Sequence, residues 1–402
     1  MQPKSKIGII GSSGVPARLG GSETLTHHLV LHLSQEFELF VFGSKRPYRK
    51  TERKSHWHGA RTIFSPFANR GIQRPLYALS SMLFAIGSTQ MVLILGLTGV
   101  LLLPILKLLT NRRFLVLIDA LHWHKNQSNS FRKMYLRLGE RIAVRYADVL
   151  IADNLAIQHY LRKTYGVQAA MVSVGGNHVR AISPTDAEKR RDEFPFLAER
   201  YVLNICRIEP HNHIDMILRT FAQYPRYQLV LVGDWSGSEY GISLKKHYQA
   251  YENMHLLDAI YDADTLNLLR SRAFVYLHSH QAGGTNASLV EAMSQGLPVI
   301  AYDNASNRET TQNQARYFNH HLAIISALEN MSLSEMRHLG ENMNRIALQR
   351  YSWAYIALCY KQVFQIGLGE TIDRSQLSLA PQYAELEQTI FNKSTGQTIA
   401  TN

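Results

Sequence analysis

The stretch HSHQAGGTNASLVEAMSQGLPV, residues 278–299, combines residue types that suit a phosphate. Gly283 and Gly284 let the backbone come close to a ligand, and residues 285–288 can cap the helix that follows. The amide groups at the start of such a helix attract an anion. Glu291 lies about one turn into the helix, where a carboxylate reaches both hydroxyls of a ribose. The stretch therefore predicts a nucleotide site. An ordinary buried turn with a capped helix and an exposed glutamate is the alternative.

Arg207 is a second candidate for contact with phosphate. It follows the apolar segment 201–206 and precedes a turn that contains Glu209 and Asn212. A guanidinium can bind a diphosphate through two parallel hydrogen bonds. The alternative is a local ion pair between Arg207 and Glu209, which would contribute little to stability.

The loop GSSGVPARLGGSE, residues 11–23, follows the first apolar strand and opens a helix. A dinucleotide fingerprint would stand here, but the glycine spacing differs and no acidic residue closes the second predicted strand, so a nicotinamide enzyme is disfavoured. Gly20 and Gly21 allow close backbone approach, and Arg18 adds a cation, which suits a phosphate or a sugar. A flexible surface loop is the alternative.

A third polar group, DALHWHK, begins at Asp119 directly after the apolar run FLVLI. Ligands bind at the carboxyl ends of strands in open α/β sheets, so Asp119 and His122 are candidate site residues. Ordinary hydrogen bonding within the loop is the alternative. Asp262 and Asp264 raise the question of a metal, but they stand in a polar turn before a helical segment, and we interpret them as a cap.

These groups are positioned by apolar strands that alternate with helix-length segments, which predicts an α/β protein with doubly wound parallel sheets. We expect a first domain, residues 1–182, on which a final helix 352–366 packs, a linker 183–200, a second domain 201–351 and a polar tail 367–402. The predicted strands are residues 6–10, 37–42, 61–64, 91–95, 114–118, 149–152 and 170–174, then 201–206, 227–232, 254–257, 274–277 and 298–301.

Composition limits the possible partners. The chain has 402 residues, too many for one ordinary core, and Lys and Arg exceed Asp and Glu by 12. This surplus suits anionic lipid, nucleic acid or phosphorylated substrates, but the basic residues are dispersed, so nucleic-acid binding is not expected. Cys206 and Cys359 lack metal spacing, and the first residues lack a signal peptide's apolar region. We therefore expect a cytoplasmic protein.

The segment MVLILGLTGVLLLPILKLL, residues 91–109, is apolar enough to raise the question of a membrane span. Gly96, Thr98 and Gly99 divide it, and Pro104 lies near the start of its second part. We predict a buried strand, a loop and a core helix, and a membrane segment is the alternative. A hydrophobic face resting on the bilayer is a separate hypothesis, which the basic surplus favours.

Six motifs, in order, resemble those of GT-B glycosyltransferases of the large fourth sequence family, and within it the bacterial polysaccharide transferases that include rhamnosyltransferases. The motifs are GSSGVPARLGGSET, DALHWHK, ADVLIADN, CRIEPHN, LVLVGDW and HSHQAGGTNASLVEAM, and they extend from about Lys6 to Ile366. The resemblance implies two Rossmann-like domains facing across a cleft. The C-terminal domain would hold the donor nucleotide and the N-terminal domain the acceptor.

The resemblance also implies roles for single residues. Glu291 matches the family's ribose-binding glutamate and Arg207 its diphosphate arginine, and Asp119 and His122 fall where a polar pair approaches the transferred sugar. The residues implied for donor binding are Arg18, Gly20, Gly21, Asn212, Gly233, His280, Gly283, Gly284, Thr285, Asn286, Ser288, Leu289 and Glu291.

Three positions depart from the family's pattern. Gly283 stands where the family usually has a glutamate that touches sugar hydroxyls, Asn212 replaces a lysine, and many relatives carry a glutamate at the position of His122. Loss of the first carboxylate suits a donor with fewer or inverted hydroxyls, such as a 6-deoxyhexose.

We therefore expect a glycosyltransferase that moves a hexose, and rhamnose is one candidate, from a nucleoside diphosphate sugar to a growing, lipid-linked bacterial glycan such as a capsule or exopolysaccharide. The family implies retention at the anomeric carbon. Neither a cofactor nor a metal is expected, and the inner face of the cell membrane is a potential location. A sugar-nucleotide epimerase, a phosphorylase and a non-catalytic nucleotide-sugar-binding scaffold remain alternatives.

Overall fold

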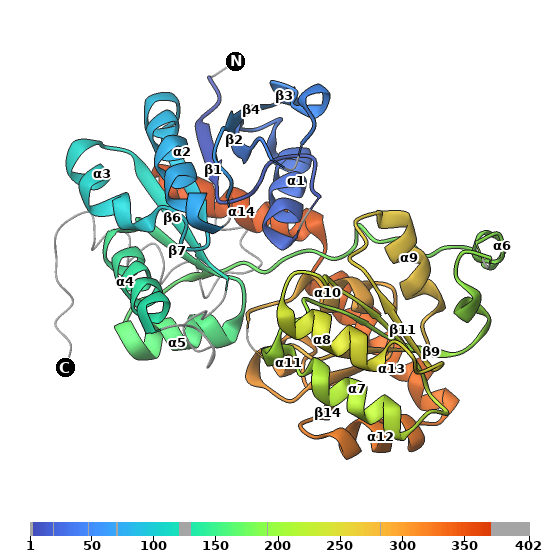
Figure 1. The fold of residues 1–402 in the computed structure, drawn as a ribbon. Helices are drawn as coiled ribbons and strands as arrows, with labels where there is room; N and C mark the ends of the chain where they lie inside the picture. The colour runs from blue at the N-terminus through green and yellow to red at the C-terminus, as the bar shows by residue number, and fades with distance from the viewer. Residues whose placement is uncertain are drawn as a thin grey trace. The chain divides into compact units, whose positions relative to one another are not determined.

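The computed structural model describes residues 3–18, 20–46, 48–69, 71–119, 130–190, 192–281 and 283–370. Contacts divide the chain into two compact units: an N-terminal unit, Met1–Ser173 with Ala354–Asn402, and a C-terminal unit, Val174–Trp353. Each unit is a mainly parallel sheet covered by helices, as the sequence predicted (Figure 1). The division falls after Ser173, so the segment 183–200 belongs to the C-terminal unit, where Phe196 and Leu197 join the core.

In the described residues of the N-terminal unit, eight strands form one sheet in the order β3-β4-β2-β1-β5-β6-β7-β8. All neighbours are parallel except β3 and β4. The strands are β1 Lys6–Ile10, β2 Glu38–Ser44, β3 His56–Trp57, β4 Ala60–Ser65, β5 Met91–Leu95, β6 Arg113–Ile118, β7 Val149–Ala152 and β8 Ala170–Met171. The helices are α1 Gly21–Leu33, α2 Arg74–Ser88, α3 Leu103–Leu109, α4 Ser130–Tyr146, α5 Leu155–Tyr165 and α14 Trp353–Leu368, with short 3-10 turns η1 Lys50–Glu52, η2 Gly71–Gln73 and η3 Val100–Leu102.

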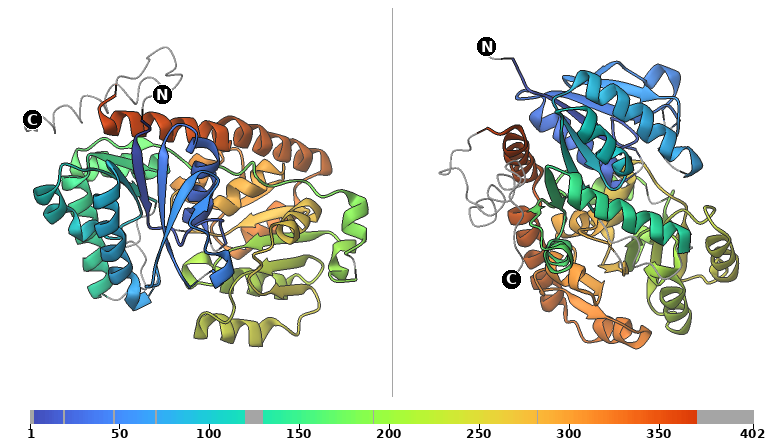
Figure 2. Two further views of the ribbon diagram at one scale, coloured as in Figure 1. Left: turned by 90° about the horizontal axis from the view of Figure 1, so that it is seen from above. Right: turned by 90° about the vertical axis from the view of Figure 1, so that its left-hand side faces the viewer.

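Helices cover both faces of this sheet, which explains the continuously apolar strands. Ile94 and Val116 point to the face that α2, α3, α4 and α5 cover. On the other face, Phe364 of α14 packs edge to face on Phe37, with ring centroids 5.5 Å apart. Figure 2 shows α14 running along the side of the sheet away from α3 and α4. Strands such as β5 are therefore buried on both sides.

The apolar segment 91–109 folds as the sequence predicted. Met91–Leu95 is strand β5, buried along its length, and a loop leads through η3 into helix α3. Gly99, at a φ of 79°, makes the sharp change of direction before η3. In the part of the chain that the structure describes, no helix is both long and apolar enough to cross a membrane.

In the C-terminal unit, six strands of the described chain form a wholly parallel sheet in the order β11-β10-β9-β12-β13-β14. The strands are β9 Tyr201–Ile205, β10 Gln228–Val232, β11 Met254–Leu257, β12 Val275–His278, β13 Val299–Tyr302 and β14 Arg316–Phe318. The helices are α6 Pro184–Glu188, α7 Ile214–Gln223, α8 Glu239–Tyr248, α9 Ala263–Arg272, α10 Ala287–Ser294, α11 Ala305–Thr310, α12 His321–Glu329 and α13 Leu333–Arg350, with 3-10 turns η5 Pro195–Ala198 and η6 Pro210–Asn212.

The strand order reverses between β9 and β12, which are neighbours in the sheet although two strands separate them in the sequence. Strands β10 and β11 extend the sheet on one side of this point, and β13 and β14 extend it on the other. In open α/β sheets the connections then leave in opposite directions and open a crevice at the carboxyl ends of the two central strands. The loops after β9 and β12 are therefore where a ligand is expected.

Candidate functional site

The carboxyl ends of β9 and β12 are held together by polar contacts. The Asn204 amide donates to the Ser279 hydroxyl at 3.0 Å, and the Tyr276 hydroxyl donates to the Ile205 carbonyl at 3.3 Å. Asn204 and Ser279 are both buried. These bonds bring together the turn after β9 that contains Arg207 and the loop after β12 that contains Gly283 and Gly284, which we call the glycine loop. The bonded residues are more than seventy positions apart in sequence.

Arg207 lies on the turn after β9. Its side chain is 66% exposed, and its Nη1 is 3.9 Å from Glu209 Oε1, a loose and solvated pair. The amide of Asn212, whose side chain is fully buried, donates to the Arg207 carbonyl at 2.8 Å. The hydrogen bond from Asn212 thus fixes the backbone of the turn, while the Arg207 guanidinium stays exposed to solvent. Asn212 therefore positions the turn, and it would influence binding of a sugar donor by positioning Arg207.

The glycine loop after β12 is fixed from α11. Amides of Asn304 and Asn307 donate to the His280 carbonyl at 2.9 and 3.1 Å, and the Ser306 hydroxyl donates to the Gly283 carbonyl at 2.9 Å. Gly283 has a φ of 142°, a conformation that side-chain-bearing residues rarely adopt. The backbone is therefore held at His280 and Gly283 before any ligand arrives.

The start of α10 differs in one respect from the prediction. Asn286 is the residue at the N-cap, but its side chain makes no capping hydrogen bond, whereas we expected a side-chain cap from residues 285–288. Without a hydrogen bond from the Asn286 side chain, the positive end of the helix can attract an anion. The Leu289 side chain is fully buried, and its amide donates to the Asn286 carbonyl at 3.1 Å.

Glu291 is the fifth residue of α10, and its side chain is 14% exposed. The guanidinium of Arg270, on α9 and 3% exposed, donates to Oε2, and Nε2 of His178 lies 3.4 Å from Oε1. Burial raises the pKa of a carboxyl, but Arg270 and His178 favour the ionised form, and together they hold the pKa of Glu291 below its usual range. Glu291 is thus a fixed carboxylate.

His178 is itself oriented by Trp353. The Trp353 indole donates to His178 Nδ1 at 3.0 Å, so a neutral His178 carries its proton on Nε2 and directs it to Glu291. The segment before His178 packs too closely for side chains, since a Cβ on Gly175 would lie 2.5 Å from the Trp353 ring and one on Gly176 2.6 Å from Val290. The end of the C-terminal unit thereby supports the carboxylate.

Two other predicted donor-binding residues, Gly233 and His280, are closely packed by neighbouring residues. Gly233 follows β10, and a Cβ there would lie 2.5 Å from the Cys206 carbonyl, so the glycine lets adjacent loops touch. His280 is buried with its ring stacked on His278, at a centroid distance of 4.6 Å. Burial lowers the pKa of His278 to about 3, so this ring is neutral at physiological pH.

The predicted residues of the N-terminal unit lie at the carboxyl edge of its own sheet. Asp119 follows β6, and a Cβ on Gly96, which follows β5, would lie 3.7 Å from Asp119 Oδ1. Gly20 and Gly21 begin α1, and a Cβ on either would meet nothing within 4 Å, so the backbone here is open. His122 lies outside the described residues.

Arg18 is engaged within the N-terminal unit. Its Nη2 donates to Glu52 Oε1 at 2.7 Å, and the guanidinium lies over the Tyr48 ring, 5.0 Å from the centroid. Its side chain is 36% exposed and that of Glu52 34%, so the pair is partly solvated. A phosphate at Arg18 would compete with Glu52 for the guanidinium.

The Asp-x-Asp sequence forms a helix cap, as predicted. The Asp262 carboxylate accepts a hydrogen bond from the Thr265 amide at 2.8 Å at the start of α9. Asp264 pairs with Arg180 at 2.7 Å.

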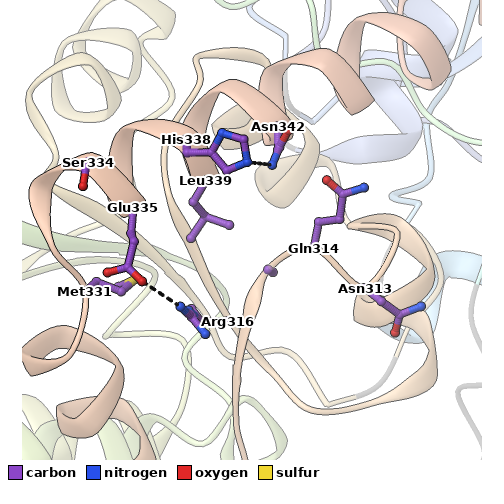
Figure 3. Close-up of a pocket in the computed structure, with 10 residues that line it drawn as sticks. Asn313, Gln314, Arg316, Met331, Ser334, Glu335, His338, Leu339 and Asn342 are labelled. Atoms are coloured by element: carbon purple, nitrogen blue, oxygen red, sulfur yellow. Dashed lines mark hydrogen bonds and ion pairs between the residues drawn. The ribbon is translucent and has the colours of Figure 1, made fainter.

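A cavity of about 540 Å³ in the C-terminal unit lies away from these loops (Figure 3). It is lined by Arg316, at the start of β14, and by His338 and Glu335 of α13. Because β14 is parallel to the other strands, its first residue marks the amino-terminal edge of the sheet, opposite the glycine loop. This cavity is therefore separate from the candidate site.

Solved structures of other proteins share this fold. Sucrose-phosphate synthase from Thermosynechococcus elongatus has a TM-score of 0.78 and 18% identity, with 91% of this chain and 100% of that chain covered. HepE from Anabaena, in complex with UDP-glucose, has a TM-score of 0.70 and 18% identity, with 90% and 99% covered. The catalytic domain of starch synthase IV from Arabidopsis thaliana, bound to ADP and acarbose, has a TM-score of 0.67 and 12% identity, with 91% and 100% covered. The two units thus have the GT-B fold.

Two family models match parts of the sequence. Residues 186–324 match glycosyl transferases group 1, and residues 91–177 match a domain of unknown function, DUF1972. The first match contains the Arg207 turn, the glycine loop and Glu291. No curated protein matches the chain significantly. The fold and the group 1 domain together support a glycosyltransferase.

The structure adds three residues that sequence reasoning missed. Arg270, His178 and Trp353 fix Glu291 but lie 21, 113 and 62 positions from it. The signals that the sequence did contain were an arginine directly after two leucines in a helical segment and a glycine pair before His178. Neither signal identifies Glu291 as the partner, because pairing over such separations depends on the tertiary fold.

Proposed function

We propose that the protein transfers a hexose, with retention at the anomeric carbon, from a nucleoside diphosphate sugar to a growing bacterial surface glycan. The observation that carries the proposal is the placement of Arg207 and Glu291 after neighbouring strands, at the point where the strand order reverses. A cation and a fixed carboxylate at this edge suit the diphosphate and the ribose of one ligand.

Glu291 has the hydrogen-bonding capacity that a ribose requires. A carboxylate offers about four lone-pair directions on its two oxygens. Arg270 donates to one oxygen of Glu291 and His178 lies against the other, so the carboxylate can accept hydrogen bonds from two further groups. The two ribose hydroxyls fit this capacity, and the existing partners keep the acceptor oxygens in place without a conformational change on binding.

The departing diphosphate is the group on which negative charge develops. Arg207, with its exposed guanidinium, and the uncapped start of α10 are the groups of this chain that would stabilise it, without a metal or a cofactor. A β-phosphate oxygen would take the proton of the acceptor hydroxyl. Asp119 would orient the transferred sugar, and Gly283 in place of a carboxylate suits a deoxyhexose such as rhamnose. The acceptor would be lipid-linked, at the inner face of the cell membrane.

The test compares Arg207→Ala and Glu291→Gln with the unsubstituted chain on a panel of nucleoside diphosphate sugars. Arg207→Ala is expected to lower kcat about 100-fold, since it removes charge stabilisation from the leaving group. Glu291→Gln is expected to raise the donor KM about 10- to 100-fold, since it weakens hydrogen bonds to a charged acceptor.

Two matched controls are available in the same unit. Arg219→Ala removes an arginine that is also 66% exposed, and Glu309→Gln removes a carboxylate that is also 14% exposed and arginine-paired. Both controls should leave transfer unchanged. Full activity of Arg207→Ala and Glu291→Gln would contradict the site assignment, and nucleotide binding without turnover on any donor would instead favour a scaffold.

A further inference from the structure

Large apolar side chains are exposed on α2 and α3, which are neighbouring helices of the N-terminal unit (Figure 1). Leu108 is 85% exposed and Leu109 71% on α3, and Phe84 is 60% exposed and Leu83 56% on α2. We define the apolar face as Leu76, Leu83, Phe84, Ile105, Leu108 and Leu109. Several large apolar side chains exposed on neighbouring helices mark a surface that binds a partner.

The core of the unit does not account for these residues. The opposite sides of the same helices are buried against the sheet through Tyr77, Met82 and Leu103. The two helices are neighbours, since Arg74, at the start of α2, donates to the Thr98 hydroxyl at 3.1 Å in the loop that leads to α3. Each helix is therefore apolar on two sides, one for the core and one outward.

The helix next to α3 carries a row of exposed cations. Helix α3 packs on α4, whose exposed Arg137, Arg141 and Arg145 are spaced by four residues and so lie along one side of the helix. The sequences of α2 and α3 contain no acidic residue, and the one in α4, Glu140, is buried and accepts hydrogen bonds from Tyr160 and Tyr165. The exposed surface of the three helices thus combines apolar side chains with positive charge.

We propose that the apolar face, with the arginines of α4 beside it, docks on the surface of an anionic lipid bilayer. Apolar side chains at the level of the acyl boundary and cations at the headgroups are the two contributions that hold a protein on such a surface. A second copy of this chain fits less well, because a symmetric contact would bring the two rows of arginines together. This proposal identifies the part of the protein that would contact the membrane. It does not depend on the transfer reaction.

Vesicle flotation tests the proposal with the full chain and no donor. Binding is expected to vesicles of phosphatidylcholine mixed with phosphatidylglycerol, and to be much weaker with phosphatidylcholine alone. Leu83→Glu combined with Leu108→Glu should weaken binding at least tenfold, since it removes two apolar anchors and adds two negative charges. Arg141→Gln combined with Arg145→Gln should weaken it on anionic vesicles only.

The matched control is Leu333→Glu combined with Leu348→Glu on α13, where the side chains are 61% and 55% exposed. This control should bind vesicles like the unsubstituted chain. Absence of vesicle binding, or equal loss in the control, would overturn the proposal, as would a dimer in solution that the Leu83 and Leu108 changes abolish without any effect on vesicles. Binding of nucleoside diphosphates by each variant, measured separately, reports on the donor site alone.

Discussion

The pair formed by Arg270 and Glu291 permits a quantitative test, through Arg270→Met. Arg270 is 3% exposed and Glu291 14%, so the substitution leaves a largely buried carboxylate without its main cation. Methionine keeps the stem volume and removes only the charge and the hydrogen bond. Burial then dominates, and the pKa of Glu291 rises.

The magnitude follows from the burial of both groups. Removing one partner of a buried ion pair costs about 3–5 kcal/mol, whereas replacing both with apolar groups is often close to neutral. We therefore expect Arg270→Met to destabilise the unit by about 3–5 kcal/mol. Arg270→Met with Glu291→Met should be at least about 2 kcal/mol more stable than Arg270→Met alone, because no charge remains unpaired.

Hydrogen–deuterium exchange of the α9 and α10 amides is the suitable measurement, since it reports local opening without assuming that the two units unfold together. The pair of Arg350 and Glu309 serves as control, because its carboxylate is also 14% exposed. Substitutions in this control pair should destabilise the protein locally but leave the binding of nucleoside diphosphates normal. Arg270→Met should bind nucleoside diphosphates more weakly as the pH falls, because Glu291 then becomes protonated.

The pH dependence of stability has a definite sign. In the unsubstituted chain the lowered pKa of Glu291 stabilises the fold at neutral pH, and this contribution disappears as the pH falls through that lowered pKa. In Arg270→Met the unpaired carboxylate is a cost that protonation relieves, so the difference between the two chains should shrink on acidification. Additive effects of Arg270→Met and Glu291→Met, or a difference that grows on acidification, would refute the reasoning.

Two further predictions concern His278 and the glycines. Because burial lowers the pKa of His278 to about 3, stability should fall by about 1.4 kcal/mol per pH unit as the pH drops below about 6.5, and His278→Asn should reduce this slope in urea-unfolding curves. Gly233→Ala should destabilise the protein by about 1–3 kcal/mol, since its Cβ would lie 2.5 Å from the Cys206 carbonyl. In Gly20→Ala the new Cβ would have nothing within 4 Å, so the melting temperature should not change, but the KM for the sugar donor should rise roughly tenfold. A destabilised Gly20→Ala would contradict the open backbone.

Most of the sheet architecture was predictable from local patterns. The strands at Lys6–Ile10, Met91–Leu95, Val149–Ala152 and Met254–Leu257 match their predicted bounds, because a strand covered on both faces is a short apolar run between turns. The two short strands β3 and β14 were missed. They lie at sheet edges, where fewer apolar residues are required.

The candidate site divides in the same way. The sequence by itself determined that Arg207 and Glu291 follow strands, because the order of strand, loop and helix is local and places polar residues at a carboxyl edge. Only the tertiary structure decided that β9 and β12 are neighbours, that Asn286 leaves α10 uncapped, and that Arg270 and His178 hold Glu291. These contacts join segments far apart in the chain, and a pairing over such distances depends on how whole helices pack, which no local run of residues specifies.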